Sequence, residues 1–124
     1  MSNEENINEL KLQLENKVGQ KVEFRFPKSE LMHEGKIVDR FVSLAPDWTG
    51  ITNFNIIDRI QFEKPKRFIA IRFGYYRRKN GRWIFAGQTS LTEKEEGLKD
   101  FLLNAAKSKN WFKNMLLEIC EELH

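Results

Sequence analysis

The sequence has few of the residues that mark a secreted or metal-binding protein. It contains one cysteine, Cys120, which excludes an internal disulfide, and only two histidines, His33 and His124. No spacing of histidine or cysteine typical of a zinc site occurs, and both the phosphate-binding glycine loop and the nucleophile elbow are missing. This pattern favours a protein without catalytic residues, metal or cofactor.

Long apolar runs are also missing. No stretch approaches the length of a membrane span, and the polar, acidic start, Met1–Glu5, lacks the basic residue and apolar run of a signal peptide. We therefore predict a cytoplasmic protein that does not enter a membrane. Hydrophobic residues make up 40% and charged residues 31%, which is typical of a globular protein, and the length fits a single domain over residues 1–124.

The spacing of apolar residues predicts an α+β domain. Residues 3–18 carry the apolar stripe of an amphipathic helix, with Ser2 or Asn3 as its cap. After Thr92, which can cap a helix, helical spacing continues to the end of the chain with an interruption at 107–110. We expect an N-terminal helix, a largely antiparallel sheet of about five strands, and a C-terminal helix or helix pair packed on the sheet. The strands are expected at 21–26, 35–44, 51–63, 67–78 and 82–91.

The strongest local signal is Asn80-Gly81, which suits a two-residue type I′ turn in which both residues have positive φ. A hairpin with this turn would set Gly74 opposite Gly87 and leave a gap without side chains. Such a gap is filled by a closely packed element or forms a shallow ligand site. The other pairs expected across the hairpin are Tyr76–Phe85 and Arg72–Thr89 on one face, and Arg77–Ile84, Tyr75–Ala86, Phe73–Gln88 and Ile71–Ser90 on the other.

Acidic residues are missing from 64–92, a segment that holds eight basic residues. The other 13 basic and 18 acidic residues give the rest of the chain a balance of −5, so charge is segregated along the sequence. Cations contact phosphates, and aromatic rings can stack on unpaired bases. We therefore predict a binding domain that contacts nucleic acid or another polyanion. The residues expected to do so are Arg72, Tyr76, Arg77, Arg78, Lys79 and Arg82.

A second hypothesis is a protein-interaction or homodimerisation module. The last helix ends in three acidic residues, Glu118, Glu121 and Glu122, which are unfavourable at a helix C-terminus unless a cation offsets them. The basic hairpin can supply that cation, within the chain or from a second copy. The apolar stripe over 111–123 is a core face or the seam of a dimer.

A third hypothesis is a small metal-dependent nuclease that uses Asp39, Asp58 and Glu63. Their spacing matches no pattern of metal ligands, and a position on the wet face of strands explains these carboxylates more simply. We expect His33 in a loop and Cys120 in the apolar core of the last helix.

Overall fold

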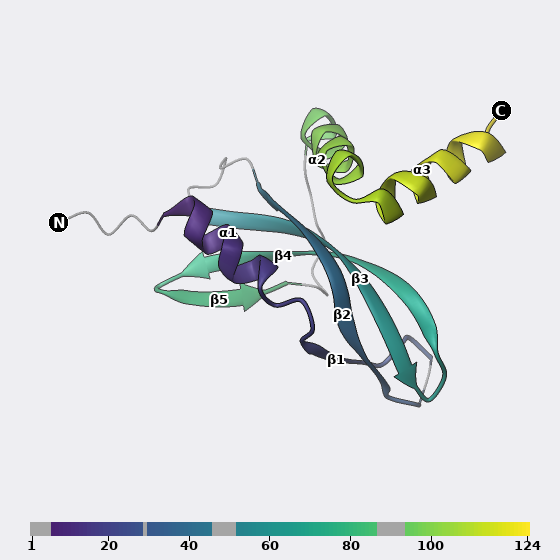
Figure 1. The fold of residues 1–124 in the computed structure, drawn as a ribbon. Coiled ribbons are helices and arrows are strands. Elements are labelled where there is room, and N and C mark those ends of the chain that lie inside the picture. The colour runs from purple at the N-terminus through teal and green to yellow at the C-terminus, as the bar shows by residue number, and fades with distance from the viewer. Residues whose placement is uncertain (1–5, 29, 46–51, 87–93) are drawn as a thin grey trace. The chain divides into compact units, whose positions relative to one another are not determined.

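The computed structural model describes residues 6–28, 30–45, 52–86 and 94–124 (Figure 1). The chain forms two compact units, Met1–Ser90 and Leu91–His124, and each is described by itself. The predicted α+β class is confirmed: one helix, an antiparallel sheet and a C-terminal helix pair follow one another. The elements are α1 (Ile7–Glu15), β1 (Lys21–Phe24), β2 (His33–Leu44), β3 (Thr52–Lys64), β4 (Phe68–Lys79), β5 (Arg82–Phe85), α2 (Glu95–Ser108) and α3 (Asn110–Glu122).

Helix α1 is shorter than predicted because its cap lies further along the chain. Asn6 is the N-cap, and its side-chain oxygen accepts a hydrogen bond from the amide of Asn8 at 2.8 Å. The predicted caps Ser2 and Asn3 lie outside the described residues. Leu10 and Leu14, one helical turn apart, are buried and form the apolar side of the helix.

The described residues of the first unit form a sheet in which neighbouring strands are also neighbours in sequence, in the order β1-β2-β3-β4-β5. The predicted hairpin turn is confirmed, with φ of 52° at Asn80 and 74° at Gly81. The expected pairing of Tyr76 with Phe85 is also confirmed, as is that of Arg77 with Ile84. The pairs that involve Gly87 and Thr89 lie outside the described residues.

A β-bulge in β2 decides which side chains face the core. Ile37 is opposite Ile60 and Asp39 is opposite Arg59, so Val38 has no partner in the register. One extra residue in a strand reverses the alternation of side chains beyond it. Beyond the bulge, the even-numbered residues of β2 therefore face the same side of the sheet as the even-numbered residues of β3.

Two hydrophobic clusters occupy this side, which we call the inner face. The first lies between α1 and the sheet. It consists of Leu10 and Leu14 from α1 and of Val42, Phe54, Ile56 and Tyr76 from the sheet, with Trp83 packed against it. The second lies at the other end of the long strands and consists of Val22, Ile37, Ile60 and Phe62, with Phe24, Phe26, Phe68 and Ala70 against it. The register places one row of charged residues between the two clusters.

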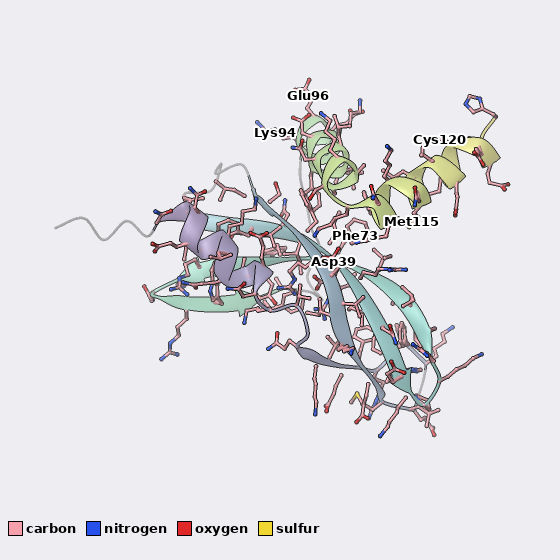
Figure 2. All side chains as sticks on the ribbon, viewed as in Figure 1. Asp39, Phe73, Lys94, Glu96, Met115 and Cys120 are labelled. Atoms are coloured by element: carbon pink, nitrogen blue, oxygen red, sulfur yellow. The ribbon has the colours of Figure 1, made fainter. Side chains whose placement is uncertain are left out.

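The second unit is a helix pair. Lys109 has an extended backbone between α2 and α3, which confirms the predicted interruption. Helix α2 begins at Glu95 with Lys94 as N-cap, whereas the predicted cap Thr92 lies outside the described residues. Cys120 lies near the end of α3 and is exposed, so its predicted burial is wrong (Figure 2). None of the described helices combines the length and apolarity needed to cross a membrane.

Candidate functional site

The row of charged residues consists of Arg40 on β2, Asp58 on β3 and Arg72 on β4, which are direct neighbours across the strands. We call these three residues the charged row. Nε and Nη2 of Arg40 donate to the two carboxylate oxygens of Asp58 at 2.5 and 2.9 Å. Nε and Nη2 of Arg72 donate to Oδ2 of Asp58 at 3.2 and 2.8 Å. One carboxylate thus holds two guanidinium groups.

Burial separates the roles of the two arginines. The side chains of Arg40 and Asp58 are 0% exposed, whereas that of Arg72 is 22% exposed. Arg40 also donates to the backbone oxygen of Leu14 at 3.1 Å and to the hydroxyl of Tyr76 at 3.2 Å. Arg40 is therefore a structural cation that links α1 to the sheet, and Arg72 is the member of the charged row that reaches solvent.

Arg40 stays charged at every pH at which a protein is normally handled. Burial lowers the pKa of Arg40, but the hydrogen bond and negative charge of Asp58 outweigh it, so the pKa lies above its ordinary value. The stabilisation that this group contributes is present below its ordinary pKa and is lost only as the pH rises through the higher folded value. The pair Arg40–Asp58 is therefore neutral as a unit, and Arg72 adds a net positive charge.

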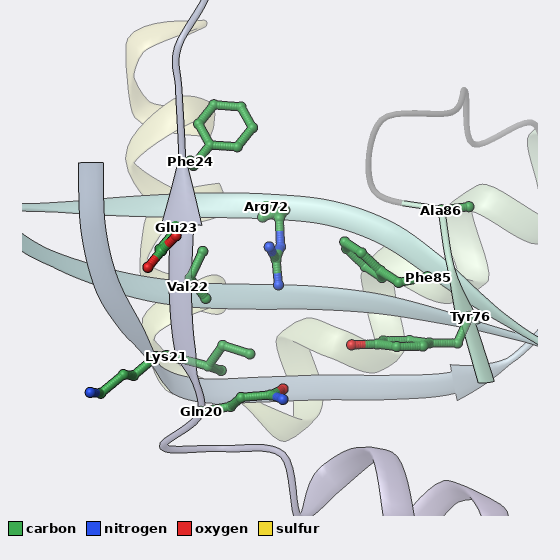
Figure 3. Close-up of a pocket in the computed structure, with 10 residues that line it drawn as sticks. Gln20, Lys21, Val22, Glu23, Phe24, Arg72, Tyr76, Phe85 and Ala86 are labelled. Atoms are coloured by element: carbon green, nitrogen blue, oxygen red, sulfur yellow. The ribbon is translucent and has the colours of Figure 1, made fainter. Parts of the chain in front are cut away.

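This excess charge faces a pocket of about 610 Å³. The pocket is bordered by both edge strands of the sheet, β1 and β5, which shows that the sheet curls until its two edges flank one hollow. Figure 3 shows the side chain of Arg72 between Val22 and Phe85. The residues that line the pocket are Gln20, Lys21, Val22, Glu23, Phe24, Ile37, Arg72, Tyr76, Phe85 and Ala86.

The guanidinium of Arg72 is held in place from two sides. Its central carbon lies 4.7 Å from the centre of the Phe85 ring, while Asp58 binds Nε and Nη2. Within the described part of the chain, Nη1 of Arg72 donates to no protein acceptor. The hydroxyl of Tyr76 accepts from Arg40, so its own proton is available to a ligand. The pocket therefore presents positioned donors and one unbalanced positive charge.

The structure divides the predicted polyanion-binding residues between the two faces of the sheet. Arg72 and Tyr76 lie on the inner face, as does Arg78, whose guanidinium stacks on Trp83 at 4.8 Å. The alternation of side chains along the hairpin places the other three on the opposite, outer face. The outer-face residues are Arg77, Lys79 and Arg82.

The three carboxylates considered as metal ligands do not converge. Asp39 is opposite Arg59 in the register, on the face away from Asp58, and Glu63 is exposed beside Arg67. In the ranges that the structure describes, no group of histidine, cysteine and carboxylate side chains could hold a metal ion. The expectation that Asp58 lies on a wet face is wrong, because the strands around it are buried on the inner face and Arg40 neutralises it there.

His33 is likewise not a loop residue. It begins β2, and its ring lies 4.9 Å from Phe26 and 5.6 Å from Phe68, centre to centre. The predicted loop position is wrong because the strand starts two residues earlier than its apolar pattern indicates. His33 is therefore part of the aromatic end of the inner face, away from the charged row.

A groove of about 470 Å³ lies in the helix pair. Its walls include Leu103 and Leu117, about half of whose surface is exposed, and Lys107 and Lys113. The homodimer seam predicted for this helix stays a prediction, because no second copy is present to occupy the groove.

The sequence reasoning missed Arg40 altogether and misplaced Asp58. The signal that could have found them is that three neighbouring strands each carry charge inside an apolar stretch, at Asp39-Arg40, Asp58-Arg59 and Arg72. Such a charge needs a partner of opposite sign on the adjacent strand. The charged row is therefore a pattern across strands, and no single strand displays it.

Comparison with known proteins assigns neither a family nor a function to this chain. The chain matches no protein-family model, no curated protein and no solved structure. A function must therefore be argued from the charged row and the pocket that it faces.

Proposed function

We propose that this protein is a non-enzymatic binding domain that takes an anionic group of its ligand into the pocket at Arg72. The observation that supports this function is the excess positive charge of the charged row, in which two guanidinium groups share one carboxylate. A partly buried cation without a full counter-charge is unfavourable, and an incoming anion relieves that cost.

The surroundings of Arg72 suit a carboxylate or phosphate oxygen. Its planar guanidinium is fixed by Asp58 and Phe85, so little side-chain freedom is lost when a ligand binds. Nη1 of Arg72 and the hydroxyl of Tyr76 can both donate to one anionic group. Lys21 and Glu23 also border the pocket, but they are of opposite charge and point away from Arg72 (Figure 3).

Arg72→Gln is expected to weaken binding of small anions about 10- to 100-fold, because a charge-assisted hydrogen bond and the excess charge are both lost. The change leaves Asp58 paired with Arg40, so the fold should persist. The probes are benzoate and inorganic phosphate, titrated into labelled protein and followed by NMR. In the parent protein, the amide shifts should gather at Val22, Arg72 and Phe85.

The matched control is Lys21→Gln, which removes a positive charge from the rim of the same pocket. This variant should bind both probes within about threefold of the parent, because rim charges in water contribute little. Shifts spread evenly over the basic residues of the chain, or equal losses in the two variants, would show general charge attraction and not a site at Arg72.

A second candidate is contact with nucleic acid or another polyanion through the outer face of the hairpin. The register places Arg77, Lys79 and Arg82 on this face, and none of them belongs to the charged row. Tyr75 lies on the same face by alternation and can stack on a base. The outer face therefore carries three of the six residues predicted to contact nucleic acid, and it lies on the side of the sheet opposite the pocket.

The triple variant Arg77→Ala, Lys79→Ala and Arg82→Ala tests this candidate by mobility shift of single-stranded RNA and DNA at low and moderate salt. We expect binding to fall, and the slope of log affinity against log salt to fall by about 0.7 for each phosphate contact removed. Arg72→Gln is the control and should retain most of the binding. Absence of binding to the parent protein at low salt would end this candidate.

A further inference from the structure

We infer that the ligand of the Arg72 pocket is a monocarboxylate with an unbranched aliphatic tail, of the chemical class of medium-chain fatty acids. The inference rests on the proposed function, since the carboxylate is the anionic group placed at Arg72. Beyond that function, the inference states where the rest of the ligand lies and that this part is aliphatic.

A second, apolar pocket of about 240 Å³ adjoins the first, and most of its lining residues belong to the inner face. Val22, Phe24 and Arg72 line both pockets, so the two hollows adjoin along these three residues. Apart from Arg72, every residue that lines the second pocket is apolar. The remaining lining residues are Phe26, Ile60, Phe62, Ala70, Ile71 and Phe73.

This polarity fixes the orientation of a ligand. The charged row supplies one excess positive charge, at the junction of the two pockets, which suits a single anionic head group. A second charge further along would lie among aromatic rings and be desolvated without a partner. The head group therefore lies at Arg72 and an uncharged tail extends over Phe24 toward Phe62.

The apolar end offers surface that a tail would cover. Phe24, Phe26, Phe68 and Ala70 pack against the second hydrophobic cluster but are only partly buried. The rings of Phe24 and Phe26 are in edge contact at 4.7 Å, which gives one wall a fixed shape. A flexible alkyl chain can follow such a wall, and each methylene that leaves water contributes to affinity.

A series of carboxylates of increasing length tests the inference by isothermal titration and NMR. Each added methylene should raise affinity about fourfold, so octanoate, with four more methylenes, should bind about 250-fold more tightly than butyrate. Octanol has the same tail without the charge and should bind at least about tenfold more weakly than octanoate. Contacts of the octanoate methyl group with Phe24 and Phe62, measured by isotope-filtered NOE, would place the tail directly.

Ala70→Leu tests the apolar pocket separately from the anion site, because it narrows the apolar pocket and leaves Arg72 unchanged. Octanoate should then bind about tenfold more weakly, while butyrate binds as before. If this variant does not fold, the NOE contacts in the parent protein decide the question. If binding depends on Arg72 but the affinity is the same for butyrate and octanoate, the inference of an aliphatic tail is wrong, while the proposed anion site at Arg72 is retained. Failure of every carboxylate to bind would overturn the inference, and failure of inorganic phosphate as well would overturn the proposed function itself.

Discussion

Asp58→Asn is expected to lower the free energy of unfolding by about 3–5 kcal/mol, the usual cost of removing one partner from a buried ion pair. The change leaves Arg40 fully buried and Arg72 partly buried without a counter-charge. For a domain whose total stability is about 5–15 kcal/mol, this is a large fraction. Urea unfolding followed by tryptophan fluorescence and circular dichroism measures the loss.

Glu63→Gln is the control for this prediction, because it makes the same change of carboxylate to amide on the same strand. Glu63 is about half exposed, accepts a hydrogen bond from the side-chain amide of Gln61 and forms a long surface contact with Arg67, at 3.7 Å. Its replacement should cost less than about 1 kcal/mol. If both variants lose the same small amount of unfolding free energy, the charged row is hydrated and its ion pairs do not stabilise the fold.

The same physics explains why the charged row points to a function. A buried ion pair is on average no more stabilising than a well-packed apolar pair of similar volume. Stability alone therefore does not require charges between two hydrophobic clusters. The pair Arg40–Asp58 is balanced, but Arg72 adds a charge that stability does not explain and that faces the pocket. The anion whose binding we propose would supply the missing counter-charge.

The elements that the sequence predicts well are those set by local patterns. Alternation and β-branched residues locate the strands, and the Asn80-Gly81 turn fixes the pairing of Tyr76 with Phe85. The order of helix, strands and helix pair follows in the same way. The limits of elements are less exact, since Asn6 caps α1 in place of Ser2 or Asn3.

The arrangement of the candidate site follows only in part from the sequence, because it depends on the register between strands that are distant in sequence. Arg72 and Tyr76 were expected to bind an anion, but the residues that position them are Arg40 and Asp58. The bulge at Val38 turns Arg40 inward, and no residue pattern in β2 announces that bulge. A one-residue shift would place Arg40 on the outer face, so pattern reading alone cannot recover the charged row.

Gly35→Ala is expected to destabilise the first unit by about 1–3 kcal/mol or more, the range for inserting a group into a filled core. A Cβ atom at this position would lie 2.7 Å from Cα of Phe62 and closer still to the carbonyl oxygen of Gln61. These are backbone atoms, which cannot rotate away. Since Gly35 pairs with both Val22 and Phe62, relief of the clash must separate β2 from β3.

The control is Gly81→Ala at the hairpin turn, where the added Cβ meets no atom within 4 Å but φ is 74°. Its cost is the strain of a positive φ, about 1 kcal/mol. Thermal unfolding of both variants separates a steric cause from a conformational one. If Gly35→Ala loses no more stability than Gly81→Ala, then β2 and β3 can move apart easily. In that case the position of Val22, which lines both pockets and pairs with Gly35, would not be fixed, and the shape of the apolar pocket could not select an aliphatic tail.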